Sequence, residues 1–153
     1  MCQRVRTCPR SRGPGPFHPR PDILGDVSEP DSAAELERTV ERYNDAWNTQ
    51  DLEAIVSLHA PGMVFENHTA GERAEGDDVR EHIARIFANW PDLRFRGRRL
   101  YARDGLVVSE WTASATDGDG RRLEWDGIDV FPFENGLILR KDVYSAGHRP
   151  RVL

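Results

Sequence analysis

The sequence predicts an α+β fold, in which three N-terminal helices and a strongly curved antiparallel sheet form a cone around an apolar pocket. Two observations predict it. Residues 32–91 contain three segments whose apolar residues recur with helical spacing. Residues 93–144 contain four long strand-like segments that follow one another directly. Helices gathered at the start and consecutive strands afterwards are typical of an α+β domain whose helices cover one face of the sheet.

The first helix begins at Ser32, because Ser32 and Glu35 form a capping box. Its apolar side chains then recur on one stripe, at Leu36, Val40, Tyr43 and Trp47. A second, short helix is capped by Asp51 and stops at Pro61, and residues 63–68 alternate as a strand. The third helix begins at Asp77 or Asp78 and stops before Pro91.

The four later strands cover residues 93–102, 106–116, 122–133 and 137–144. Short segments that contain glycine with Asp or Asn separate them, and such segments are typical of hairpin turns. The strands are therefore expected to form an antiparallel meander.

Length and composition limit the possible functions. A chain of 153 residues with 38% apolar residues predicts one core, and no apolar run approaches the ~20 residues needed to cross a membrane. Cys2 and Cys8 offer neither a disulfide framework nor a zinc site, so a reducing, cytoplasmic location is expected. The net charge is −5, and Lys141 is the one lysine among 21 basic residues. We interpret this arginine bias as a codon habit and expect no nucleic-acid partner.

We divide the chain into a disordered tail rich in Arg and Pro (1–30), one domain (31–147) and a short C-terminal tail (148–153). The first segment has no pattern that could bury apolar surface. An organelle transit peptide and a misassigned start codon are alternatives for it.

The strand at residues 122–133 carries the most informative residue. One face bears a single carboxylate, Asp129, in a row of otherwise apolar residues: Leu123, Trp125, Gly127, Phe131 and Phe133. A buried carboxylate must be protonated, hydrogen-bonded or paired. Asp129 is therefore either a structural residue, fixing a loop or paired with an Arg, or a neutral acid that donates a hydrogen bond to a ligand.

Two further polar residues are expected to face the interior. Tyr43 lies on the buried stripe of the first helix, either as a core aromatic or as a functional group. Asn67 shares a strand face with Met63 and Phe65, which leaves His68 facing solvent. His59 and His82 are expected at the surface.

Three runs carry a family resemblance: YNDAWNTQDLEAI at 43–55, VFENH at 64–68 and GIDVF at 127–131. Over residues 32–146 the chain resembles the nuclear-transport-factor-2-like superfamily. It is most similar to the branch with ketosteroid isomerases, SnoaL-type polyketide cyclases and limonene epoxide hydrolases.

The resemblance implies roles for particular residues. Ketosteroid isomerases form an oxyanion hole from a Tyr and a protonated Asp, which correspond to Tyr43 and Asp129. Their base position corresponds to Asn67, which cannot take up a proton, so standard steroid isomerisation is disfavoured. Epoxide hydrolysis is disfavoured because residues 109–113 lack the required Arg and Asp. The acid/base Asp of SnoaL-type cyclases lies one residue from Asp142, whose alternative role is a surface ion pair with Arg140 or Lys141.

We therefore expect an isomerase or cyclase that acts on a small, apolar carbonyl or polyketide-like substrate through an enolate, without a cofactor or a metal. A non-catalytic module that binds a small ligand is the alternative. The expected pocket has Tyr43, Asn67 and Asp129 as polar groups and is lined by Trp47, Phe65, Trp111, Trp125, Phe131 and Phe133. Apolar residues on the outward rows of the sheet predict a homodimer: Val107, Trp111, Ile128 and Val130.

Overall fold

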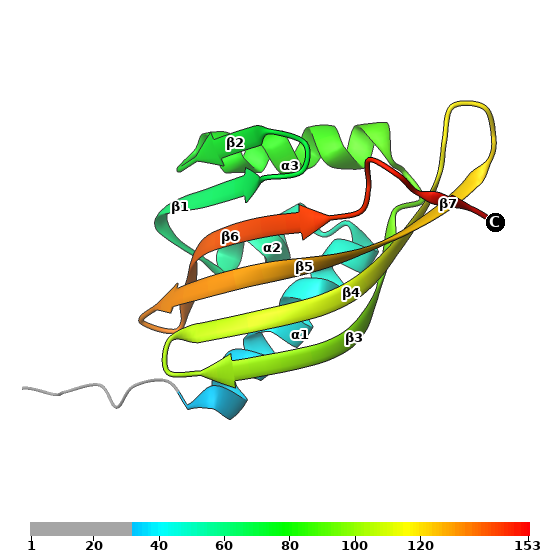
Figure 1. Ribbon diagram of the computed structural model, residues 1–153. Helices are drawn as coiled ribbons and strands as arrows, with labels where there is room; N and C mark the ends of the chain where they lie inside the picture. Colours follow the sequence, from blue (N-terminus) through cyan, green and yellow to red (C-terminus); the bar gives the residue numbers. More distant parts are fainter. Residues whose placement is uncertain (1–31) are drawn as a thin grey trace, which may run out of the picture.

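The computed structural model describes residues 32–153, which form three helices and seven strands (Figure 1). The helices are α1 (Ala33–Thr49), α2 (Leu52–Ser57) and α3 (Asp78–Asn89). The strands are β1 (His59–Asn67), β2 (Glu72–Glu75), β3 (Arg94–Arg103), β4 (Leu106–Thr116), β5 (Arg122–Glu134), β6 (Leu137–Ser145) and β7 (Arg151–Val152). The tail predicted at 1–30 lies outside the described residues.

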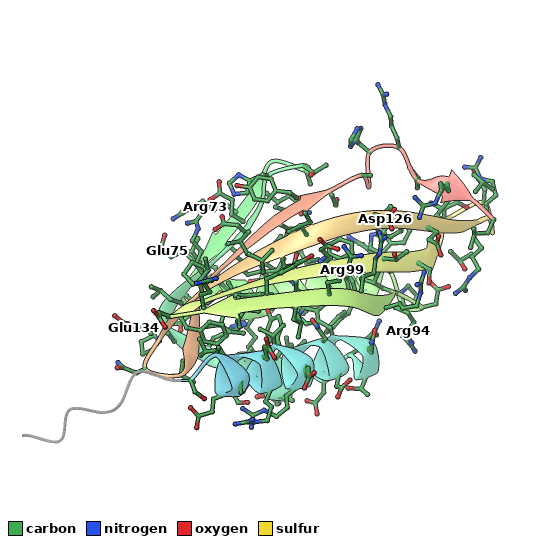
Figure 2. The ribbon with its side chains drawn as sticks, turned by 60° about the horizontal axis from the view of Figure 1, so that its bottom comes forward. Arg73, Glu75, Arg94, Arg99, Asp126 and Glu134 are labelled. Atoms are coloured by element: carbon green, nitrogen blue, oxygen red, sulfur yellow. The ribbon has the colours of Figure 1, made fainter. Side chains whose placement is uncertain are left out.

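The strands form one curved sheet in the order β2-β1-β6-β5-β4-β3, and the helices lie on one side of it (Figure 1). Strands β3 to β6 are the predicted antiparallel meander. This arrangement confirms the α+β cone. Figure 2 shows Glu134 at one end of the sheet and Arg94 at the other, with α1 running along the strands.

Local signals explain the helix boundaries. The backbone N–H of Ser32 donates to Oε2 of Glu35 at 2.9 Å, and the side chain of Ser32 caps the Glu35 N–H in return. Asp51 caps α2 by accepting a hydrogen bond from the Ala54 N–H at 3.0 Å. Both predicted caps are confirmed, and they satisfy backbone donors that have no partner within the helix.

The inward face of the sheet forms the core with the apolar stripe of α1. On β4 the inward row contains Val107, Ser109 and Trp111, all buried. Val107 and Trp111 are therefore not available for the outward apolar surface that we expected. Ile128 does contribute to that surface, because it lies on the opposite face of β5 from Asp129 and is 41% exposed.

Three features of the sheet escaped the sequence analysis. Strand β1 begins at His59, earlier than predicted, and it pairs in parallel with β6. The short edge strand β2 was not predicted. Residues 148–153 were expected to be a tail, whereas β7 within them pairs with β5. Within the described part of the chain, no helix is long and apolar enough to cross a membrane.

Candidate functional site

A cavity of about 240 Å³ lies between the inward face of the sheet and helices α1 and α3. Four of the six predicted aromatic residues line it: Trp47, Phe65, Trp111 and Trp125. Phe131 lies instead in the core, fully buried against the ring of Tyr43, and Phe133 packs at the edge of the core. Two charged residues, Asp129 and Lys141, lie among the aromatic walls.

Asp129 and Lys141 form a buried ion pair. Nζ of Lys141 lies 3.1 Å from Oδ2 of Asp129, and the two residues are only 4% and 2% exposed, respectively. Lys141 comes from β6 and Asp129 from β5, the neighbouring strand, and both side chains point to the helix-covered side of the sheet. The carboxylate that the sequence placed alone in an apolar row therefore has a basic partner, a lysine rather than an arginine.

Burial opposes charge on both members of this pair. It raises the pKa of Asp129 and lowers the pKa of Lys141, while the charge of each partner acts against the other's shift. One proton shared by two groups leaves the pair without net charge, whichever group holds the proton. The site can therefore shift that proton from one group to the other at no change in total charge.

Aromatic rings surround the Lys141 ammonium group. Its Nζ lies 4.4 Å from the ring centroid of Trp47, 5.2 Å from that of Tyr43 and 5.4 Å from that of Phe65. The ring of Phe131 is slightly farther, at 5.7 Å. Ring faces attract a cation at such distances, and the attraction offsets part of the cost of burying it. We call these four rings and Asp129 the cation cage.

Several buried polar atoms near the pair lack a hydrogen-bond partner among residues 32–153. They include Oδ1 of Asp129, the hydroxyl of Ser109 and the indole nitrogens of Trp47 and Trp111. Ser109 lies directly opposite Asp129 in the β4–β5 register. An unpaired buried polar group is costly. Asp129, Trp47 and Trp111 line the cavity, so their unpaired atoms are available to a ligand there, whereas Ser109 does not line it.

Gly127 fixes the position of one cavity wall. A Cβ atom at Gly127 would lie 2.2 Å from the nearest atom of the Trp111 ring, which leaves no room for a side chain. The Trp111 indole therefore lies directly on the backbone of β5 at Gly127, two residues before Asp129.

Tyr43 lies beneath the cavity rather than in its wall. Its hydroxyl group is fully buried and shares a 3.2 Å hydrogen bond with Nε2 of His59. Burial, and the nearby charge of Lys141, lower the pKa of His59 to about 4, so His59 is neutral at pH 7. His59 and His82 were expected at the surface; instead His59 is largely covered and His82 is buried against the ring of Phe65.

Asn67 does line the cavity, at its rim. Its side-chain oxygen accepts hydrogen bonds from the backbone N–H groups of Thr69 and Ala70, at 3.2 and 3.1 Å. The amide thus holds the turn after β1. A neighbouring hollow of about 290 Å³ shares Asn67 and Trp125 and is bordered by residues 147–150 near the C-terminus.

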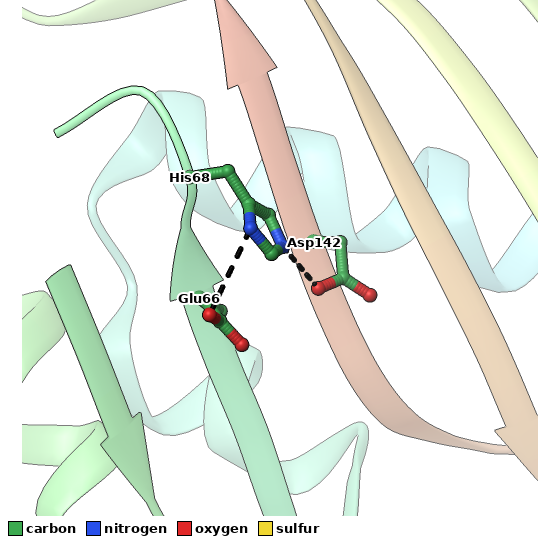
Figure 3. A group of neighbouring side chains, drawn as sticks. All are labelled: Glu66, His68 and Asp142. Atoms are coloured by element: carbon green, nitrogen blue, oxygen red, sulfur yellow. Dashed lines mark hydrogen bonds and ion pairs between the residues drawn. The ribbon is translucent and has the colours of Figure 1, made fainter. Parts of the chain in front are cut away.

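Asp142 lies on the other face of β6 from Lys141, in a surface cluster with Glu66 and His68 (Figure 3). Arg140 belongs to the same cluster. Oδ1 of Asp142 is 2.7 Å from Nε2 of His68, and the Arg140 guanidinium pairs with both Asp142 and Glu66. These contacts lower the pKa of Asp142 despite partial burial. Oxygen and nitrogen atoms of Glu66, His68 and Asp142 lie within 4.8 Å of one another, and the Arg140 guanidinium already pairs with both carboxylates, so a metal ion would have to compete with it.

Sequence reasoning identified Asp129 and missed its partner. Lys141 was considered as a neighbour of Asp142 and as the one exception to an arginine bias that we interpreted as a codon habit. The signal was present in the composition: in a chain whose other 20 basic residues are all arginine, the single lysine stands on the inward row of a strand. A bulky guanidinium and a compact ammonium group are not interchangeable in an enclosed site, so that exception was informative.

Comparisons with known proteins agree with this architecture. A SnoaL-like protein of unknown function from Burkholderia thailandensis is 26% identical, with a TM-score of 0.63 over 78% of this chain and 100% of its own. A candidate SnoaL-like polyketide cyclase from Jannaschia is 17% identical, with a TM-score of 0.69 over 80% of this chain and 92% of its own. AclR, a candidate hydroxylase from Streptomyces galilaeus, is 20% identical, with a TM-score of 0.65 over 74% and 80%.

The search of curated proteins gave no match. The family defined by the SnoaL-like domain matches residues 40–141, which include the second half of α1, the Asp129 strand and Lys141. The chain therefore belongs to the SnoaL-like domain family.

Proposed function

We propose that this protein is an isomerase or cyclase that acts on a small, largely apolar carbonyl compound through an enolate, with Asp129 and Lys141 as the acid–base pair. One observation carries the proposal. Oδ2 of Asp129 is held by Lys141, while Oδ1 is buried at the cavity without a hydrogen-bond partner among residues 32–153. Asp129 can therefore form a hydrogen bond with a ligand while it stays paired with Lys141.

The shared proton gives the pair both functions that enolate chemistry requires. With the proton on Lys141, Asp129 is a base that can remove a proton next to the carbonyl group, and the Lys141 ammonium stabilises the enolate oxygen. With the proton on Asp129, the acid donates to the oxygen and the lysine amine is the base. Either form supplies one donor and one acceptor. The pair thus provides the base that was missing from the position of Asn67.

The cavity walls limit the substrate. Indole and phenyl rings form most of the surface around the pair, and the volume of about 240 Å³ suits a molecule of one or two fused rings. The polar atoms beside the pair can compensate the carbonyl group of a substrate, whereas the aromatic walls would not replace the hydration of further charged groups. The candidate polyketide cyclase among the structures of similar fold supports the same class, because polyketides are rich in carbonyl groups.

Exchange of carbon-bound hydrogen tests the proposal. We expect the protein to accelerate exchange of the α-hydrogens of 2-tetralone in D₂O, followed by NMR, above the rate in buffer. Asp129→Asn should lower the acceleration, because an amide cannot accept the proton and only the Lys141 amine remains as a base. Asp126→Asn is the matched control, since Asp126 lies on the same strand and binds Arg151 at the surface.

A non-catalytic binding module is the second candidate, since Asp129 and Lys141 also satisfy each other's charge. Quenching of tryptophan fluorescence by 2-tetralone without accelerated exchange would favour the module. Absence of both binding and exchange would overturn the proposal for this class of ligand.

A further inference from the structure

We propose that Lys141 forms a covalent imine with aldehyde or ketone ligands in the cavity, so that the site works as a Schiff-base lysine site. This inference rests on the proposed function in one respect: the cavity must admit a small carbonyl compound. It goes further because the ε-amino group bonds covalently to the carbonyl carbon of the ligand instead of only forming a hydrogen bond with it.

The position of Lys141 is the first argument. It is the one lysine of the chain, it is 4% exposed, and it nevertheless lines the cavity. Lysine side chains are almost never fully buried unless paired, because the ammonium group is strongly hydrated. A solvated surface role is thus excluded for this residue. Its Nζ atom is available only to Asp129, the aromatic rings and whatever enters the cavity.

The second argument is that Lys141 can become a nucleophile. Only the neutral amine attacks a carbonyl carbon, and burial favours that form. Asp129, at 3.1 Å, can take the released proton within the site. No acceptor from solvent is needed, and the departing proton stays within hydrogen-bond reach for the later steps.

The third argument is that the cation cage fits the product. In a protonated imine the positive charge lies on the Lys141 nitrogen, as it does in the ammonium group. The four rings at 4.4 to 5.7 Å and the carboxylate of Asp129 would therefore stabilise the iminium as they stabilise the ammonium. The apolar walls also keep bulk water, which hydrolyses imines, away from the bond.

The reaction balances with these groups alone. The amine lone pair of Lys141 forms the C–N bond while the C=O π pair moves to oxygen, which takes the proton held by Asp129. The nitrogen then returns one proton to Asp129. Finally, the nitrogen lone pair expels the hydroxyl group, which leaves as water with the proton from Asp129. The products are a cationic imine, an Asp129 carboxylate and one water molecule.

Reductive trapping tests the inference. The wild-type protein is incubated with 2-naphthaldehyde and sodium cyanoborohydride, and the intact mass is followed with time. Each trapped imine adds the mass of the aldehyde less one oxygen atom. Peptide mapping then distinguishes Lys141 from the α-amino group at the N-terminus, the other primary amine of the chain.

We expect a single adduct at Lys141, formed at least about tenfold faster than on Nα-acetyl-lysine, because the lowered pKa favours the neutral amine and the cavity holds the aldehyde beside Nζ. Lys141→Arg keeps a cation but has no nucleophilic amine, and it should give no adduct at this position. A control independent of the variant's folding is the wild type unfolded in urea, where the rate at Lys141 should fall to that of the free amino acid.

Adducts confined to the N-terminus, or a folded-state rate equal to that of Nα-acetyl-lysine, would overturn the inference. These outcomes are separate from those of the exchange experiment. Accelerated exchange of 2-tetralone without trapping would leave the enolate proposal intact and refute the imine. Trapping without accelerated exchange would support the imine and refute enolate turnover.

Discussion

The Nζ atom of Lys141 lies 3.1 Å from Oδ2 of Asp129, inside a ring of four aromatic side chains. The charge of each residue compensates part of the free-energy cost of burying the other. The pair is also the one place on the cavity wall where a carboxylate and a cation meet among indole and phenyl rings. Stability and the proposed function therefore depend on the same two side chains.

The first prediction concerns the strength of this coupling. Removing one member of a buried pair leaves the other charge uncompensated, at a typical cost of about 3–5 kcal/mol in unfolding free energy. Lys141→Met and Asp129→Leu should each be destabilised by about 3 kcal/mol at pH 7, and the double variant should be more stable than either. Urea titrations of the four proteins measure the coupling. Additive losses in the double variant would show that the pair contributes nothing as a pair.

The second prediction concerns pH. In Lys141→Met, Asp129 is alone, and its raised pKa makes the folded state hold a proton that the unfolded chain releases near pH 3.9. The contribution of protonated Asp129 to the unfolding free energy is complete below that pH. As the pH rises, this contribution falls by about 1.4 kcal/mol per pH unit until the folded-state pKa is reached. In Asp129→Asn, the lowered pKa of Lys141 gives the opposite slope: stability falls as pH decreases from about 10.4 toward the folded-state pKa.

The wild type should show neither slope from this pair. Folded and unfolded chains both hold one proton on the two groups between about pH 3.9 and 10.4, provided that the folded pair keeps its proton throughout. The measurement is the difference in unfolding free energy between each variant and the wild type at pH 5, 7 and 8.5. Slopes of the same sign in both variants would contradict the shared-proton description.

The third prediction separates Tyr43 from the chemistry. Its hydroxyl bonds to His59 and does not line the cavity, so Tyr43→Phe should cost about 1 kcal/mol of stability and leave the exchange of 2-tetralone unchanged. If Tyr43 is an oxyanion donor, as the family resemblance implies, the same variant should lower the exchange rate by about 10²-fold or more. Comparison of the exchange rate with the urea midpoint decides between the two roles.

The fourth prediction concerns the wall formed by Trp111. A methyl group at Gly127 would overlap the Trp111 ring, so Gly127→Ala should displace the indole into the cavity and cost about 1–3 kcal/mol. We expect weaker binding of 2-tetralone, measured by fluorescence quenching. Gly118→Ala is the control, because a Cβ atom there meets nothing within 4 Å. Equal affinities of the two variants would show that Trp111 does not shape the ligand site.

Much of this architecture could be predicted from local sequence signals. The capping box at Ser32, the glycine turns and the alternation on β5 act over a few residues, and each led to the correct element. The partner of Asp129 could not be found in this way, since it depends on the register between β5 and β6. Asp129 pairs with Val143, and Lys141 lies two residues before Val143, so strand alternation places Lys141 on the same side of the sheet as Asp129. Parallel pairing of β1 with β6 is likewise a long-range property without a local signal.

The last prediction concerns assembly through the outward face of the sheet, where we still expect a homodimer. Ile128 and Tyr144 are register partners on β5 and β6, and they are 41% and 49% exposed. Helices cover only the opposite face (Figure 1), so these side chains remain in contact with water unless a second copy covers them. Burying a charge at the centre of such an interface is prohibitive.

Ile128→Glu should therefore convert the dimer to a monomer, measured by light scattering at tens of micromolar protein, while the urea midpoint changes little. Val152→Glu is the matched control, because Val152 is 61% exposed on β7 and away from this face. A monomeric wild type at the same concentration would refute the dimer. A dimeric Ile128→Glu variant would instead place the interface on another surface, because a buried glutamate at its centre could not be tolerated without a partner.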